Sequence, residues 1–195
     1  VLDSGIDYFL TEFQNADGTT RILTLWDQSA IPDVEHNRLP PEGYTEGVLY
    51  TRDEINEALA AGSRQEGLAI VPQQDISGHG TAVAALAAGS QSGVAAQAQL
   101  VVVKLGNPLA ESFPRTTQLM RGISYAVNLG VELNMPVVVN LSFGNTYGDH
   151  RGESLLERFI DNASEIGRTA IIIGSGNEGA SNGHTAGIAL TQKNI

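Results

Sequence analysis

Cysteine is absent from this sequence of 195 residues, which excludes disulfides and thiolate metal sites. Basic residues are also scarce: 11 Lys and Arg stand against 22 Asp and Glu, so the net charge is -11. Because such a charge repels nucleic-acid backbones and anionic membrane surfaces, we expect neither as a partner. No apolar run approaches the roughly 18 residues that a membrane-spanning helix requires. These absences leave the cellular location open.

The first residues contain no initiator Met, no basic segment and no apolar signal core. Val1 and Leu2 run directly into Asp3-Ser4-Gly5, as the end of a strand runs into a turn. The total length favours a single domain. We therefore expect a fragment of one larger domain.

Strand and helix patterns alternate over the second half of the chain. Continuous apolar runs predict strands at residues 100–105, 136–141 and 170–173. Apolar residues at helical spacing predict helices at residues 119–127 and 155–166. This order favours right-handed crossovers, so we predict an α/β fold with a mainly parallel sheet and helices on both of its sides.

An earlier segment differs in composition. Residues 22–26 predict a short strand, and residues 27–47, rich in Pro, Asp, Glu and Gly, predict a loop. Residues 51–54 read Thr-Arg-Asp-Glu, a capping box that predicts a helix ending at Gly62. We interpret residues 22–71 as an insertion with a small structure of its own.

A histidine between two glycines begins another predicted helix, in Gly78-His79-Gly80. The residues that follow, up to Gly89, are small and apolar on every side, which predicts a helix inside the protein. Taken alone, His79 is explained more readily as a helix cap or a packed core residue than as a catalytic base.

Polar residues are expected to meet at one edge of this sheet. Asp3, Ser142 and Asn177 each follow a strand, and His79 begins a helix. Singly they have ordinary explanations as an Asx-turn, a strand-end hydroxyl, a turn residue and a cap. Because open α/β sheets bind ligands at the carboxyl ends of their strands, together they favour a common site.

Five motifs stand in the order that one protein family shows. They are Val1-Leu2-Asp3-Ser4-Gly5-Ile6-Asp7, Gly78-His79-Gly80-Thr81, Gly93-Val94-Ala95 with residues 98–104, Asn140-Leu141-Ser142-Phe143-Gly144, and Gly176-Asn177-Glu178-Gly179. Together they resemble the Asp, His, post-His, substrate-binding and oxyanion-hole motifs of the subtilisin-like serine proteases, or subtilases. The resemblance implies a three-layer subtilisin-like fold and a serine endopeptidase that hydrolyses peptide bonds of protein or peptide substrates.

The resemblance also implies a role for each matched residue. His79 would be the general base, and Asp3 would orient its ring and stabilise the imidazolium. Asn177 would donate its amide to the developing oxyanion, an effect worth ~3 to 4 kcal/mol. Substrate binding falls to Ser142, Phe143, Gly144, Gly174, Ser175 and Gly176. The loop from Asn107 to Arg115 could line the opposite side of the cleft, although its sequence matches the family poorly.

The sequence departs from the family in two places. The nucleophilic serine of the family lies in a Gly-Thr-Ser-Met-Ala motif downstream of the Asn motif, and the chain contains neither this motif nor a Gly-x-Ser-x-Gly elbow. We therefore expect the chain alone to be inactive. Ala82 stands where the family usually has a second His, which affects helix packing more than chemistry.

Metal and cofactor sites are not expected. Glu12 matches the position of a calcium-liganding acid of the family, but one carboxylate does not define a metal site and a surface position explains it. The remaining histidines form no recognisable ligand spacing with another His, Asp or Glu. We assign no metal and no cofactor.

Residues 21–28 and 50–59 resemble segments of the Csp-type subtilases of spore-forming Firmicutes. That group includes proteases that activate cortex-lytic enzymes during germination and members that have lost catalytic residues. A non-catalytic binding or signalling protein on the subtilase scaffold is therefore the alternative to a protease. A nucleotide-binding domain is disfavoured because no Gly-x-Gly-x-x-Gly or Lys-containing phosphate loop follows any predicted strand.

An incomplete parallel sheet leaves an edge and an apolar face uncovered. We therefore expect the isolated chain to self-associate or to be unstable.

Overall fold

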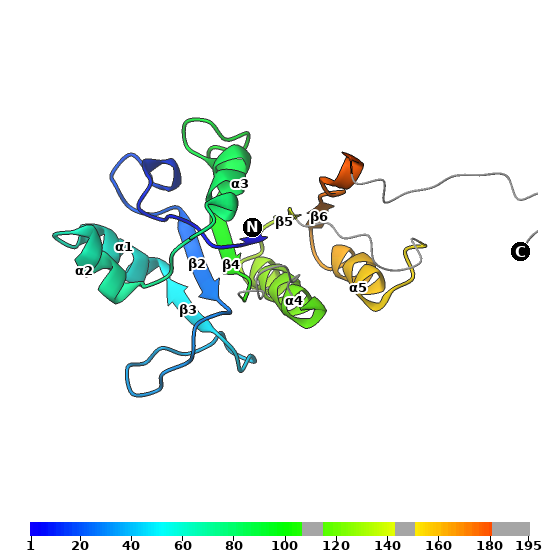
Figure 1. Ribbon diagram of the computed structural model, residues 1–195, viewed down its shortest axis with the longest axis horizontal. Coiled ribbons are helices and arrows are strands. Elements are labelled where there is room, and N and C mark those ends of the chain that lie inside the picture. Colours follow the sequence, from blue (N-terminus) through cyan, green and yellow to red (C-terminus); the bar gives the residue numbers. More distant parts are fainter. Residues whose placement is uncertain (107–114, 143–150, 181–195) are drawn as a thin grey trace, which may run out of the picture.

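A six-stranded sheet forms the centre of the computed structural model, which describes residues 1–106, 115–142 and 151–180 (Figure 1). Its order is β3-β2-β4-β1-β5-β6. The strands are β1 (Leu2–Asp3), β2 (Ile22–Asp27), β3 (Val48–Thr51), β4 (Leu100–Lys104), β5 (Val137–Leu141) and β6 (Thr169–Ile173). Every neighbouring pair is parallel except β2 with β3, which confirms the predicted mainly parallel sheet.

Helices cover both faces of this sheet. The α-helices are α1 (Arg52–Ala60), α2 (Arg64–Ile70), α3 (His79–Ala88), α4 (Thr116–Glu132) and α5 (Leu155–Ser164), and short 3-10 helices are η1 (Thr11–Phe13) and η2 (Glu178–Ala180). Helix α3 lies on one face, whereas α4 and α5 lie on the other (Figure 1). The predicted capping box of α1 is present, between Thr51 and Glu54. No helix in the described ranges is long and apolar enough to cross a membrane.

Two hydrophobic cores result, one on each face of the sheet. Strand β4 alternates between them: Val102 packs into the core that contains α1 and α3, and Val103 packs into the core that contains α4 and α5. Both valines are buried, at 1% and 0% exposure. This explains the continuous β-branched sequence of β4, because a strand buried on both faces needs no polar alternation.

The sequence predicts a small structure of its own for residues 22–71. The structure corrects this, because strands from this segment belong to the main sheet. Strand β2 lies inside the sheet, between β3 and β4. Leu25 packs into one core and Trp26 into the other, both fully buried. The indole of Trp26 also donates to the carbonyl of Glu46 at 3.0 Å, so the predicted loop is fastened to the same sheet. Apolar side chains on both faces of β2 must be buried on both sides. A place in the main sheet, with one hydrophobic core on each face, buries them.

Helix α3 is buried on one side only, which corrects the expectation of a helix inside the protein. Ala84 and Ala88 face the core, whereas Leu86 is 69% exposed. On the same side of the sheet, Val138 of β5 and Ile172 of β6 are also exposed. We call these three exposed side chains the open apolar face; no described segment covers it. Because α3 is small and apolar all round, its sequence does not indicate which side of the helix packs against the sheet.

Candidate active site

Asp3 ends the short strand β1 in the middle of the sheet. Its side chain is buried at 1% exposure. On one side its register partner is Lys104 of β4, and on the other Leu2 pairs with Leu141 of β5. Because Ser142 follows Leu141 directly, it lies beside Asp3 at the carboxyl end of the next strand. The structure thus brings Asp3 and Ser142 to the same sheet edge, as the sequence predicted.

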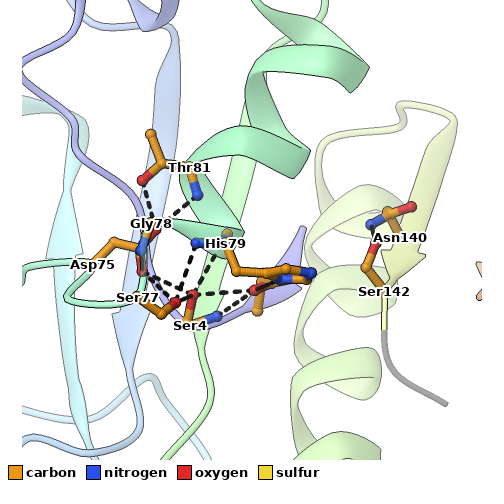
Figure 2. Close-up of polar contacts among 10 residues, drawn as sticks. Ser4, Asp75, Ser77, Gly78, His79, Thr81, Asn140 and Ser142 are labelled. Carbon is orange, nitrogen blue, oxygen red and sulfur yellow. Dashed lines mark hydrogen bonds and ion pairs between the residues drawn. The ribbon is translucent and has the colours of Figure 1, made fainter. Parts of the chain in front are cut away.

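His79 is the first residue of α3, and its ring contacts Asp3. The distance from His79 Nδ1 to Asp3 Oδ1 is 2.7 Å (Figure 2). The next residue, Gly80, permits this approach, because a Cβ at Gly80 would lie 2.3 Å from the carbonyl oxygen of Gly5. The helix begins from Gly78 in a left-handed conformation with φ 73, which glycine adopts without steric cost.

This contact fixes the state of the imidazole ring. Asp3 Oδ1 accepts from Nδ1 of His79, and it also accepts from the backbone amide of Ser4 at 2.7 Å. In the neutral ring the proton therefore sits on Nδ1, which leaves Nε2 as a proton acceptor. The His79 side chain is 51% exposed, so a reactant can reach it.

A second His–Asp pair shows why burial matters. His36 Nδ1 lies 2.6 Å from Asp33 Oδ2, but both side chains are exposed, at 73% and 45%. Solvent screens that pair, and a surface contact of this kind contributes little. Asp3 differs because its side chain is enclosed at 1% exposure, so water competes less for the carboxylate oxygen that contacts His79. Burial rather than distance distinguishes the His79–Asp3 pair.

The carboxyl ends of β5 and β6 adjoin this pair. Asn140 donates its amide to the hydroxyl of Ser142 at 2.8 Å, which orients that side chain (Figure 2). The amide of Gly174 donates to the carbonyl of Leu141 at 2.9 Å, so the two strands leave the sheet side by side. Of the other predicted substrate-binding residues, Ser175 and Gly176 follow in exposed chain, whereas Phe143 and Gly144 lie outside the described residues. So do residues 107–114 of the predicted opposite loop.

Asn177 lies in an exposed bend after β6, before η2. It therefore follows a strand whose carboxyl end adjoins that of β5, as predicted. Among the described contacts, none joins Asn177 to Asp3 or His79. Its role at the oxyanion stays a prediction.

The sequence reasoning missed Asp75, which lies just before α3. Its Oδ1 accepts from the hydroxyl of Ser4 at 2.8 Å, and its Oδ2 accepts from the amide and the hydroxyl of Thr81 at 2.8 and 2.6 Å. Burial disfavours the charged carboxylate, but hydrogen bonds from Thr81, Ser4 and Ser77 outweigh burial and hold the pKa of Asp75 below its ordinary value. An acidic residue close before a helix start was the signal that could have revealed it.

Beneath the pair lies a buried ion pair. The ammonium of Lys104 is 3.3 Å from Asp27 Oδ2 and donates to the carbonyl of Gln74 at 3.1 Å. Both charged side chains are about nine-tenths buried, at 11% and 7% exposure. Because Gln74 immediately precedes Asp75, Lys104 fixes the segment that enters α3.

Glu12 is half-buried and does not stand free on the surface. Its carboxylate accepts from the amide of Gln91 at 3.1 Å. Nearby, the guanidinium of Arg21 donates to the carbonyls of Ala88 and Ala96. A buried cation thus already occupies the carbonyl of Ala88 at the end of α3 and that of Ala96 in the chain that follows, so these groups do not suit a second cation. No group of three or more His, Asp or Glu in the described ranges could hold a metal ion.

Comparison with known protein families matches residues 1–194 to Peptidase S8, the subtilase family. A subtilisin-like protease of Coccidioides posadasii (strain C735) is 33% identical over 115 residues, which are 58% of this chain and 27% of that protein.

Two solved structures are also similar. The Clostridium perfringens CspB protease superposes with a TM-score of 0.75 and 34% identity over 93% of this chain and 37% of that one. An S41 psychrophilic protease matches with a TM-score of 0.56 and 23% identity over 91% of this chain and 45% of that one, a likeness of fold alone. The chain thus spans less than half the length of these relatives. Since the family match extends from residue 1 to residue 194, the chain belongs to the subtilase family.

Proposed function

We propose that the whole protein is a serine endopeptidase in which Asp3 and His79 act with a nucleophilic serine. In this mechanism Nε2 of His79 takes the serine proton as the serine oxygen attacks the scissile carbonyl carbon. The imidazolium that forms then gives its proton to the leaving amine, and Asp3 stabilises that cation. Asn177 donates to the oxyanion of the tetrahedral intermediate.

One observation carries this proposal: the 2.7 Å contact of His79 Nδ1 with a carboxylate that is buried. A base needs a fixed tautomer and a free acceptor nitrogen, and the contact supplies the first while leaving Nε2 for the second. A binding protein on the same scaffold has no use for a buried aspartate aimed at a half-exposed histidine. The pair therefore favours a protease over the non-catalytic alternative.

The serine itself would come from outside these 195 residues, because the sequence contains no motif of the family for it. We propose that residues 1–195 form part of the catalytic domain, with residues 22–71 between its Asp and His motifs. On this proposal the chain alone contains the base, the orienting acid and the oxyanion donor, but it does not hydrolyse peptides because the nucleophile is missing.

The substrate would be an extended segment of a protein. Ser142 and Gly174 follow neighbouring parallel strands, and on this proposal main-chain groups of the substrate-binding residues would accept the peptide as a further strand. The 34% identity with the CspB protease over nearly the whole chain supports the Csp type, and the resemblance to that group implies limited cleavage of a protein substrate.

Hydrolysis of an unfolded protein substrate by the whole protein tests this function. His79→Ala should lower kcat by at least about 10⁴-fold, because the base acts as a unit with its partners. The matched control is His36→Ala, which removes the exposed ring of the other His–Asp pair and should keep the wild-type rate. Full activity in the His79→Ala variant would overturn the proposal.

A further inference from the structure

Asp75 is a second carboxylate close to the His79–Asp3 pair, and one hydroxyl joins the two acids. Ser4 Oγ lies 2.8 Å from Asp75 Oδ1 and 3.2 Å from Asp3 Oδ1 (Figure 2). The same oxygen accepts from the amide of Gly80 at 2.9 Å. A hydroxyl has a single proton, so the two carboxylates compete for it, and the shorter distance favours Asp75.

The remaining contacts of Asp75 fasten the start of α3. Its Oδ1 also accepts from the amide of Gly78 at 3.0 Å, and the hydroxyl of Ser77 lies 3.2 Å from the same Oδ1 and 2.8 Å from Ser4 Oγ, so it can donate its proton to either. Ser77 in turn accepts from the amide of His79 at 3.1 Å. The amides on both sides of the histidine are thus held in one network with Asp75. The negative charge of Asp75 also interacts favourably with the amino end of the helix.

We propose that Asp75 is a positioning residue for the His79–Asp3 pair, which it holds through Ser4 and whose charged imidazolium it stabilises. This inference rests on the proposed function. Asp75 adds a second negative charge near the ring, and it draws the Ser4 proton away from Asp3, whose charge is then less neutralised. Both effects favour the protonated ring.

Other charged groups around the histidine form pairs of their own. Lys104 pairs with Asp27 at 3.3 Å, and Arg64 pairs with Asp7 at 2.9 Å. Among the described acids, Asp3 contacts the ring directly, and the hydroxyl of Ser4 joins Asp75 to Asp3. Among the described contacts, none pairs either cation with Asp75. Removal of the negative charge of Asp75 should therefore destabilise the protonated His79 ring, and neither cation offsets that change.

The test is the titration of the His79 ring, followed by NMR in the whole protein and in the Asp75→Asn variant. We expect the midpoint to fall by roughly half a pH unit, about threefold in the proton dissociation constant. The acid limb of kcat/KM should move to lower pH by the same amount. An unchanged His79 midpoint in a folded Asp75→Asn protein would overturn the inference.

Thr81→Val is the matched control, because it removes a hydrogen bond from the same carboxylate and keeps the charge. It should lower the melting temperature and leave the His79 midpoint in place. Should Asp75→Asn fail to fold, Asp75→Ser provides the test, because it also removes the negative charge: the His79 midpoint should fall by a similar amount, and an unchanged midpoint would contradict the coupling.

The NMR readout does not depend on hydrolysis. A protein that cuts no substrate but shows the shifted midpoint would refute the proposed function and keep the coupling of Asp75 to the pair. A protease with an unshifted midpoint would do the reverse.

Discussion

Gly80→Ala tests whether the close approach of α3 to β1 positions the His79–Asp3 pair. The added methyl group would lie 2.3 Å from the carbonyl oxygen of Gly5 and 3.0 Å from Cβ of Asp3, and the first of these atoms is backbone that cannot turn aside. Because real Cβ contacts stay beyond 3.0 Å, the helix start must move by on the order of 1 Å. That shift would separate His79 Nδ1 from Asp3 Oδ1.

A displacement of this size should lower kcat/KM by about 10²-fold. Overpacking should also lower the free energy of unfolding by roughly 1 to 3 kcal/mol. Peptide hydrolysis and urea unfolding of the whole protein measure the two effects. Gly18→Ala is the control: Gly18 has a φ of +83 and open space around it, so the variant should lose about 1 kcal/mol of stability without losing rate. A Gly80→Ala protein with wild-type kcat/KM would refute the reasoning.

Three further predictions concern stability and association. Arg21→Met leaves the carbonyls of Ala88 and Ala96 without their charged donor and should reduce the free energy of unfolding by roughly 2 to 4 kcal/mol. The control is Arg158→Met, at an exposed position, which should change that free energy by less than about 0.5 kcal/mol. Equal effects of the two substitutions in urea unfolding would contradict this. The pKa of Asp75 is lower in the folded protein, so its contribution to stability is present above about pH 4 and is lost as the pH falls through the folded pKa. Asp75→Asn should therefore flatten the dependence of the unfolding free energy on pH between about pH 5 and pH 2. Parallel pH profiles of the variant and the wild type would refute this. The isolated chain should self-associate through the open apolar face, and Leu86→Gln with Val138→Thr should shift it toward the monomer by light scattering; a monodisperse wild-type monomer would contradict this.

The strands and helices of the second half followed from the sequence because their apolar periodicity matched their burial. The runs at residues 100–105, 136–141 and 170–173 became the parallel strands β4, β5 and β6. Their order also placed Asp3 and Ser142 at one sheet edge, since parallel strands end together.

The position of β2 and the exposure of α3 could not be predicted in this way. A strand of six residues with apolar side chains on both faces can belong to a hairpin or to the middle of a sheet, and only long-range pairing decides. Helix α3 is apolar all round, so periodicity could not indicate its buried side. In both cases tertiary contacts supplied the missing information.

Within the site, the sequence motifs indicated Asp3 and His79 but not the residues that hold them. Asp75 acts through hydroxyls and amides that come together only when β1 and α3 meet. Lys104 lies in an apolar strand, where its charge has no local partner. Pairings of this kind between distant segments leave no spacing in the sequence.

The most direct test of the proposed catalytic pair is labelling of the whole protein with a fluorophosphonate probe, followed by mapping of the modified residue. The predicted result is one labelled serine outside these 195 residues, with labelling lost in His79→Ala and kept in His36→Ala. Labelling that persists in His79→Ala, or no labelling of the folded wild-type protein, would contradict a role for His79 and Asp3 in activating a serine.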